Sequence, residues 1–175
     1  MITAPAGPHG AADAKGYGTL DDLREVLAFG MQYMWADTLL TAERAHLLRL
    51  ALWGGASLLL GTALMATLRA RRQHSRLLEH FGLQIAAWGA VELGVSLVRQ
   101  RSLGLRDLAG ATRLDRMLWL NIGLDVGFVL LGITLAALGW RAARRLGLVG
   151  AGIGVILQGT ALMLLDLVLA GQISR

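Results

Sequence analysis

One apolar segment, residues 117–140, places the strongest constraint on how this chain can fold. Its sequence, MLWLNIGLDVGFVLLGITLAALGW, is long enough to cross the roughly 30 Å hydrocarbon core of a bilayer as a helix. Asn121 and Asp125 lie inside it. Because an ionised carboxylate at membrane depth is costly unless it is paired, protonated or hydrated, Asp125 requires partners from neighbouring segments.

The composition is typical of a membrane protein with several spans. Hydrophobic residues make up 55% of the 175 residues, and 23 residues are glycine. The chain has no cysteine, which excludes disulfides, thiolate metal sites and a cysteine nucleophile. Most of the net charge of +5 comes from short arginine clusters beside the apolar runs. Such clusters favour contact with anionic lipid over nucleic-acid binding.

The pattern predicts three regions along the chain. Residues 1–18 contain several Gly and Pro and predict a flexible tail. Residues 19–45 predict an amphipathic interfacial helix, or a helix packed on the end of the bundle, because apolar residues share one helical face: Leu20, Leu23, Leu27, Met31 and Met34. Residues 46–175 predict four membrane spans at about 47–68, 81–98, 117–140 and 146–169. The expected fold class is therefore an all-α membrane protein, a four-transmembrane-helix bundle preceded by an amphipathic helix.

The distribution of arginine favours one orientation in the membrane. Four spans place both termini on one side, together with the linker at residues 99–116. The two short loops hold seven arginines with no acid between Arg69 and Arg76 or between Arg141 and Arg145. We therefore expect a multi-pass protein of the bacterial inner membrane, with these loops cytoplasmic and the termini outside. The five arginines of the linker reduce the difference between the two sides.

Polar residues of the spans fall into two layers. Glu92 lies six residues before the end of the second span, Asp125 eight residues into the third, and Asp166 three before the end of the fourth. At a rise of about 1.5 Å per residue, these carboxylates lie roughly 5 to 12 Å below the same surface, so we expect one acidic cluster. Gln84 and Gln158 form a second, neutral layer toward the other surface.

The acidic cluster needs a cation and hydrogen-bond donors. Arg49 enters the first span from the same surface and is the expected cation, with Arg113 and Arg116 as alternatives. Asn121 is the expected hydrogen-bond donor. Two interpretations stay open: a structural knot that fixes helix register, or a site for a proton or another cation. No proline interrupts any of the four spans. This differs from many transporters, whose helices are broken near the midplane.

Small residues predict where helices pack. Gly123 and Gly127 form a GxxxG pair on the face of the third span opposite Asp125, leaving that face for another helix or another subunit. Gly147 and Gly154 share the polar face of the fourth span. In a glycine-rich chain a GxxxG pair also arises by chance.

The sequence contains no motif for an enzyme, a cofactor or a metal. It has no phosphate-binding loop, nucleophile elbow or zinc-binding helix motif. Among its histidines only His74 and His80 are expected on the same side, at a solvated loop, so haem ligation by two histidines in the bundle is not expected. We expect no catalytic residue, no metal and no cofactor.

Three segments resemble a known family: RLALWGGASLLLG (residues 49–61), LWLNIGLDVGF (118–128) and ILQGTALMLLD (156–166). They are similar to DUF6992, a family of small bacterial four-span membrane proteins of unknown function. The similarity covers about residues 45–171. Members commonly begin with a signal-like segment that this chain lacks. The resemblance implies a shared bundle and supplies no activity.

Two functions follow as hypotheses. The first is a non-enzymatic accessory subunit of a larger membrane complex, such as a photosynthetic reaction-centre and antenna or respiratory assembly, with the bilayer and other membrane subunits as partners. The second is a small proton- or cation-translocating protein that uses the acidic cluster. A lipid- or pigment-binding bundle is a third class, based on Trp53, Trp88 and Trp119 and on the glycine-lined faces. An interfacial belt also explains Trp53, Trp119 and Trp140, which lie near span ends.

Overall fold

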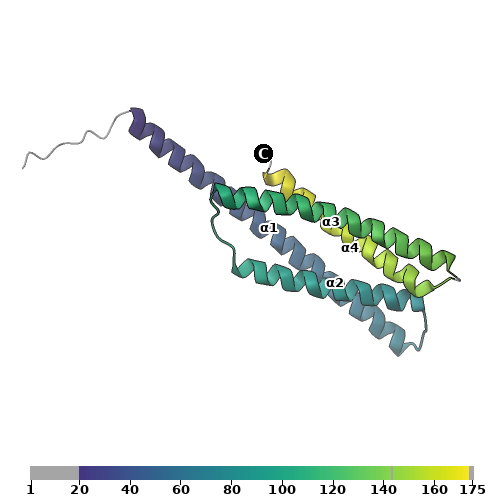
Figure 1. Cartoon of the computed structure of the whole chain (residues 1–175). Helices are drawn as coiled ribbons and strands as arrows, with labels where there is room; N and C mark the ends of the chain where they lie inside the picture. Colours follow the sequence, from purple (N-terminus) through teal and green to yellow (C-terminus); the bar gives the residue numbers. More distant parts are fainter. Residues whose placement is uncertain (1–19, 143, 174–175) are drawn as a thin grey trace, which may run out of the picture. The chain divides into compact units, whose positions relative to one another are not determined.

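The computed structural model describes residues 20–142 and 144–173, and every regular element within them is a helix. These helices are α1 (Leu20–Ala70), α2 (Arg76–Arg101), α3 (Leu108–Arg141) and α4 (Leu146–Ile173) (Figure 1). All four contain a stretch long and apolar enough to cross a membrane. The expectation of an all-helical chain is confirmed. The predicted flexible tail, residues 1–18, lies outside the described residues.

The chain divides into two units, residues 1–35 and 36–175, and α1 contributes to both. In the first unit, α1 exposes large apolar side chains along its length: Leu20, Leu23, Val26, Leu27, Met31, Met34 and Trp35. The second unit contains the rest of α1 and the other three helices. Helix α1 continues through residues 45 and 46, where the pattern predicts a boundary. No glycine or proline occurs between Gly30 and Gly54, so nothing in the sequence interrupts the helix there.

Side-chain caps define where two helices begin. The Ser75 hydroxyl accepts a hydrogen bond from the Leu78 N–H at 3.4 Å, at the start of α2. The Asp107 carboxylate accepts one from the Gly110 N–H at 2.7 Å, at the start of α3. Each cap satisfies a backbone donor that has no partner within its own helix. Helices α2 and α3 therefore start in the polar segments that precede the apolar runs.

Short connections make successive helices of the second unit antiparallel. The α1–α2 loop and the α3–α4 loop lie at the same end of the bundle (Figure 1). Both turn through an arginine in the left-handed region, Arg72 with φ 51° and Arg144 with φ 52°. A residue other than glycine costs roughly 1–2 kcal/mol of conformational free energy in this region. The C-termini of α2 and α4 and the start of α3 lie at the opposite end.

Glycines spaced seven residues apart bring α1 and α2 into backbone contact. Gly54 of α1 lies opposite Gly89 of α2, and Gly61 lies opposite Gly82. A methyl group at Gly89 would lie only 2.5 Å from the backbone nitrogen of Leu58, and one at Gly61 would lie 2.6 Å from the carbonyl oxygen of Gly82. Seven residues make about two helical turns, so both contacts fall on one stripe of each helix. Only glycine allows this separation of the two backbones.

Helix α4 packs against both α2 and α3. On α3, a methyl group at Gly132 would lie 2.7 Å from the carbonyl oxygen of Gly152. A methyl group at Gly150 of α4 would overlap the carbonyl oxygen of Leu77 of α2. Small residues on two sides of α4 therefore hold it between its neighbours.

Apolar side chains fill the end of the bundle that carries the α4 C-terminus. Two buried clusters lie there, formed by Leu39, Ala111 and Leu114 and by Leu118, Ile122, Leu169 and Ala170. Farther along, the rings of Trp88 and Phe128 meet edge to face, with their centroids 5.3 Å apart, and join α2 to α3. Buried polar side chains lie among these apolar groups.

Candidate functional site

Three buried carboxyl groups from three helices lie close together. Glu92 of α2 is 4% exposed, Asp125 of α3 is 5% exposed and Asp166 of α4 is 8% exposed. The charge of Asp125 acts on Glu92, and the charge of Asp166 acts on Asp125. The structure thus brings together the three acids that the sequence places at one depth.

A histidine of α1 lies beside this cluster. His46 Nε2 lies 3.3 Å from an Asp166 carboxylate oxygen, and His46 is 5% exposed. Sequence reasoning did not single out this histidine. The signal that could have found it is the spacing of Glu43, His46 and Arg49, three titratable residues three positions apart at the edge of an apolar run. Residues at this spacing share one side of a helix.

Arg49, the expected cation, takes a different position. Its side chain is half-buried, and its Nη1 atom is buried with no hydrogen-bond partner in the described residues. The side chain of α1 that contacts the Asp166 carboxylate is His46, one helical turn earlier. The rotation of α1 about its axis decides which of these two side chains meets the acid. The alternatives Arg113 and Arg116 are exposed on α3.

A small polar cavity of about 20 Å³ lies beside the His46–Asp166 pair. Its polar lining comes from all four helices: Glu43, His46, Arg99, Asn121 and Asp166. A cavity of this size holds about one water molecule when several polar groups surround it. Asn121 therefore has access to the same small volume as Asp166, and Arg99 contributes a positive charge that acts on Asp166.

Three carboxyl oxygens of the other two acids lack hydrogen-bond partners in the described part of the chain. Both carboxyl oxygens of Glu92 and one of Asp125, Oδ2, are buried with no partner in the described residues. An ionised carboxylate in such a position costs several kcal/mol, about the penalty for an uncompensated buried charge. A bound proton or a small ligand would remove that cost. In the described residues, no three His, Asp or Glu side chains are placed to hold a metal ion.

A hydrogen-bonded glutamine closes the centre of the bundle on the far side of the acids. Gln158 of α4 is 2% exposed. Its Oε1 accepts a hydrogen bond from Trp53 Nε1 at 2.6 Å, and its Nε2 donates to the Ile85 carbonyl at 3.4 Å. Gln84 of α2, which is expected in the same layer, packs on Gly154 of α4. A methyl group added at Gly154 would lie 2.9 Å from the Gln84 Cγ. Gln158 therefore ties α4 to α1 and α2.

A two-pronged ion pair holds the α2–α3 linker against α1. Arg106 Nε and Nη2 donate to the two carboxylate oxygens of Glu43, at 2.9 and 2.7 Å. Glu43 is 7% exposed, and these hydrogen bonds raise the pKa of the Arg106 guanidinium. Parallel donor pairs of this kind are stronger than single neutral hydrogen bonds. The pair fixes one side of the small polar cavity, because Glu43 also lines it.

The glycines expected in helix packing fall into two groups. Gly147 and Gly154 of α4 face α2, where a methyl group would meet the His80 ring or the Gln84 side chain at 2.9 Å. Gly123 and Gly127 of α3 are exposed, and a methyl group at either would have no neighbour within 4 Å. The GxxxG face of α3 is thus free of contacts with the described helices.

One comparison with known proteins gives a match. The model of a family of unknown function, DUF6992, matches residues 49–167, which is more than half of the chain. The matched region includes the three acids and Gln158, whereas Glu43 and His46 precede it. No curated protein and no solved structure matches the chain.

Proposed function

Because the chain belongs to the DUF6992 family, whose function is unknown, we propose its role from its own geometry. The protein is a non-enzymatic, integral membrane accessory subunit that docks to another membrane protein through the outer face of α3. The observation that carries this proposal is the exposed Gly123–Gly127 pair. In the membrane the short loops face the cytoplasm, as the arginine distribution favours.

The outer surface of the bundle suits a lipid environment. Large apolar side chains are exposed on every helix, including Leu59 and Leu60 of α1, which are each 70% exposed, and Leu130 of α3, which is 59% exposed. Apolar surface of this extent would drive aggregation in water. Each helix also has the length and apolar composition of a membrane span.

The outer face of α3 has the form of a helix-docking surface. Leu120, Leu124 and Leu131 are 62%, 53% and 49% exposed, and at helical spacing they flank Gly123 and Gly127. Glycine costs about 1 kcal/mol relative to alanine in a helix interior, so an exposed pair weakens α3 with no compensating contact in the described chain. A helix of another subunit packed over these glycines would supply that contact, since small residues let helix backbones approach closely.

The first unit supplies a second, independent argument for a partner. Its described residues, 20–35, expose apolar side chains along the helix, such as Leu20 at 77%, Val26 at 68% and Met34 at 72%. A helix this apolar is stable when a membrane interface or another protein covers it.

Co-purification of a tagged protein under mild detergent tests the docking proposal. We expect the wild-type protein to resist carbonate extraction from membranes and to purify with one membrane partner in fixed ratio. Gly127→Leu adds a bulky side chain to the outer face of α3 and is expected to reduce the partner at least tenfold, because leucine holds the two helices apart. The melting temperature of the isolated variant is expected to stay at the wild-type value or to rise, since no described residue of another helix lies within 4 Å of a Cβ at Gly127 and leucine has the higher helix propensity.

Gly94→Leu is the matched control for this experiment. Gly94 is an exposed glycine of α2 that also has nothing within 4 Å, so the same side chain is added on another outer face. This variant is expected to keep the partner. A wild-type protein that purifies alone as a monomer, or an equal loss of partner in both variants, contradicts the proposal.

The buried carboxyl groups favour a second candidate function, the binding and transfer of protons. Its specific observation is that Glu92 and Asp125 have carboxyl oxygens without partners in the described residues. The charge of Asp166, which lines the small polar cavity, acts on Asp125. Complete transfer also requires a path to the end that carries the short loops. The Trp53–Gln158 pair and the glycine contacts occupy that part of the bundle, which is why this function ranks second.

Proton flux in liposomes distinguishes the second candidate from the first. If the carboxyl cluster carries protons, the wild-type protein collapses an imposed pH gradient, and Asp125→Asn slows this at least tenfold because the amide cannot exchange a proton. Asp115→Asn, a half-buried position near the start of α3, keeps the wild-type rate. A wild-type protein without flux, or an Asp125→Asn protein with unchanged flux, excludes proton transfer.

A further inference from the structure

A basic hollow of about 580 Å³ lies where α2 and α4 begin. Its lining contains three arginines, two histidines and a serine: Arg76, Arg144, Arg145, His74, His80 and Ser75. No acidic side chain lines it. Its volume is within the usual range for a small-molecule site, and its charge selects an anion.

The side chains of this hollow are suited to a phosphate group. Arginine guanidinium groups donate paired hydrogen bonds to phosphate oxygens, and a serine hydroxyl adds a further donor. Arg144 is held in place, because its guanidinium carbon lies 5.3 Å from the centre of the Trp140 ring. Its backbone lies in the left-handed region at φ 52°, where glycine would be less strained, yet the position carries a cationic side chain.

The same hollow also has an apolar side. Leu146 and Leu148 of α4 line it and are 40% and 37% exposed, and they begin the apolar run of that helix. A ligand there meets positive charge beside the loops and apolar surface along α4. That combination matches a phospholipid, with its phosphate beside the arginines and its acyl chains along the helix.

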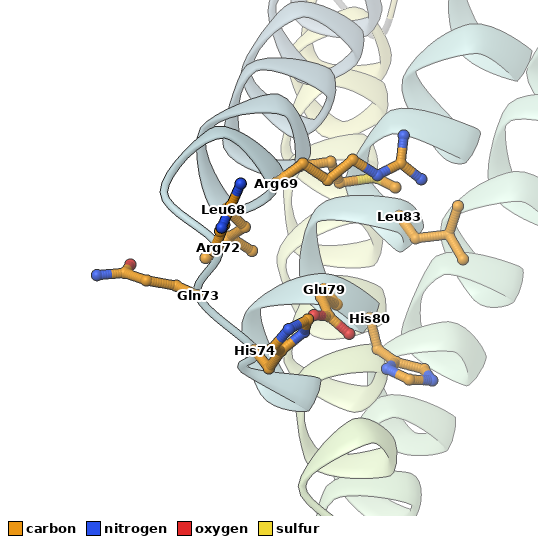
Figure 2. Close-up of a pocket in the computed structure, with 9 residues that line it drawn as sticks. Leu68, Arg69, Arg72, Gln73, His74, Glu79, His80 and Leu83 are labelled. Atoms are coloured by element: carbon orange, nitrogen blue, oxygen red, sulfur yellow. The ribbon is translucent and has the colours of Figure 1, made fainter.

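A neighbouring hollow of about 560 Å³, between α1 and α2, is less suited to an anion (Figure 2). His74 and His80 line both hollows. Figure 2 shows Arg69 extending from the end of α1 toward α2, with Glu79 beside His74. The Glu79 carboxylate would repel an anion bound in this hollow. The hollow between α2 and α4 is therefore the stronger anion site.

We propose that the hollow between the starts of α2 and α4 binds the phosphate headgroup of an anionic membrane phospholipid. The proposal rests on the membrane location proposed above and is independent of the docking face on α3. Because the site lies at the loop end, it selects lipid from the leaflet on that side. Bound lipid would join α2 to the α3–α4 loop at a point where no described ion pair links them.

Lipid binding by the purified full-length protein tests this proposal. The protein in detergent is mixed with phosphatidylglycerol or phosphatidylcholine, and bound lipid is counted by native mass spectrometry. We expect the wild-type protein to prefer phosphatidylglycerol. Arg144→Gln combined with Arg145→Gln is expected to weaken that binding on the order of 30-fold, because each substitution removes one contact between an arginine and the anionic headgroup. A thermal unfolding transition of the double variant in phosphatidylcholine, at the wild-type melting temperature, is the check that this variant is folded.

Arg113→Gln combined with Arg116→Gln is the matched control. It removes the same charge from exposed arginines at the other end of the bundle and is expected to keep phosphatidylglycerol binding. Equal binding of the two lipids, or equal loss in both double variants, overturns the proposal. Displacement of the lipid by millimolar inorganic phosphate would also overturn it, because the site would then serve a soluble anion. Carbonate extraction reports membrane location separately, so its failure is distinguishable from a failure of lipid selection.

Discussion

Gly150→Ala is expected to lower the free energy of unfolding by up to about 2 kcal/mol, or to prevent the bundle from forming. The added methyl group would overlap the Leu77 carbonyl oxygen and lie 2.8 Å from the carbonyl carbon and 3.0 Å from Cα of the same residue. These are backbone atoms, which cannot rotate away as a side chain can. Overpacking a rigid contact costs typically about 1–3 kcal/mol, and the higher helix propensity of alanine returns only about 1 kcal/mol.

Unfolding of the purified protein in mixed detergent micelles, followed by circular dichroism, measures this effect. Gly127→Ala is the matched control, because it makes the same change in a helix interior where nothing lies within 4 Å. It is expected to leave stability unchanged or to raise it by up to about 1 kcal/mol. If Gly150→Ala were as stable as Gly127→Ala, α4 and α2 would not be in backbone contact at Leu77.

Glu92→Met is expected to have a large effect in the opposite direction, raising the free energy of unfolding by about 1–3 kcal/mol. Glu92 is 4% exposed, and neither carboxyl oxygen has a hydrogen-bond partner in the described residues. An apolar side chain of similar length removes the cost of burying that group, and such replacements of buried charges are often stabilising. A costly residue that is kept in a buried position is also the mark of a functional site.

Asp166→Leu is the informative comparison, measured by the same unfolding assay. Asp166 has a partner in His46, at 3.3 Å, so removing the acid leaves a buried imidazole nitrogen without its polar partner. We expect a loss of about 1–3 kcal/mol, the usual cost of an unsatisfied buried polar group. The two acids should therefore show effects of opposite sign. A loss of stability in Glu92→Met equal to that in Asp166→Leu would mean that Glu92 is stabilised by a bound group.

The four helices could be predicted from the sequence because long apolar runs satisfy their backbone hydrogen bonds only as helices. Their ends were less predictable. Helix α3 begins at Leu108, well before the apolar run that starts at Met117. Apolar length reports how much of a helix is buried in lipid or core, whereas the end of a helix depends on a cap such as Asp107.

The grouping of Glu92, Asp125 and Asp166 was predictable for a similar reason. Each is placed along its own helix by a fixed rise per residue, so equal distance from a common end means equal height in the bundle. Which side chain of α1 contacts Asp166 was not predictable. His46 and Arg49 differ by one turn in height and by a fraction of a turn in direction, and the packing of α1 chose His46.

The sequence by itself determined that this chain is helical, how many long apolar helices it has and at what height their acids lie, because these properties depend on residues within one helix. Only the tertiary structure decided which face of each helix is inside. Gly54, Gly61, Gly82 and Gly89 form a backbone contact, whereas Gly123 and Gly127, which match a better-known packing motif, face outward. The difference has a physical cause. A helix has several faces that small residues could line, and only the fit to the neighbouring helices selects the one that becomes buried.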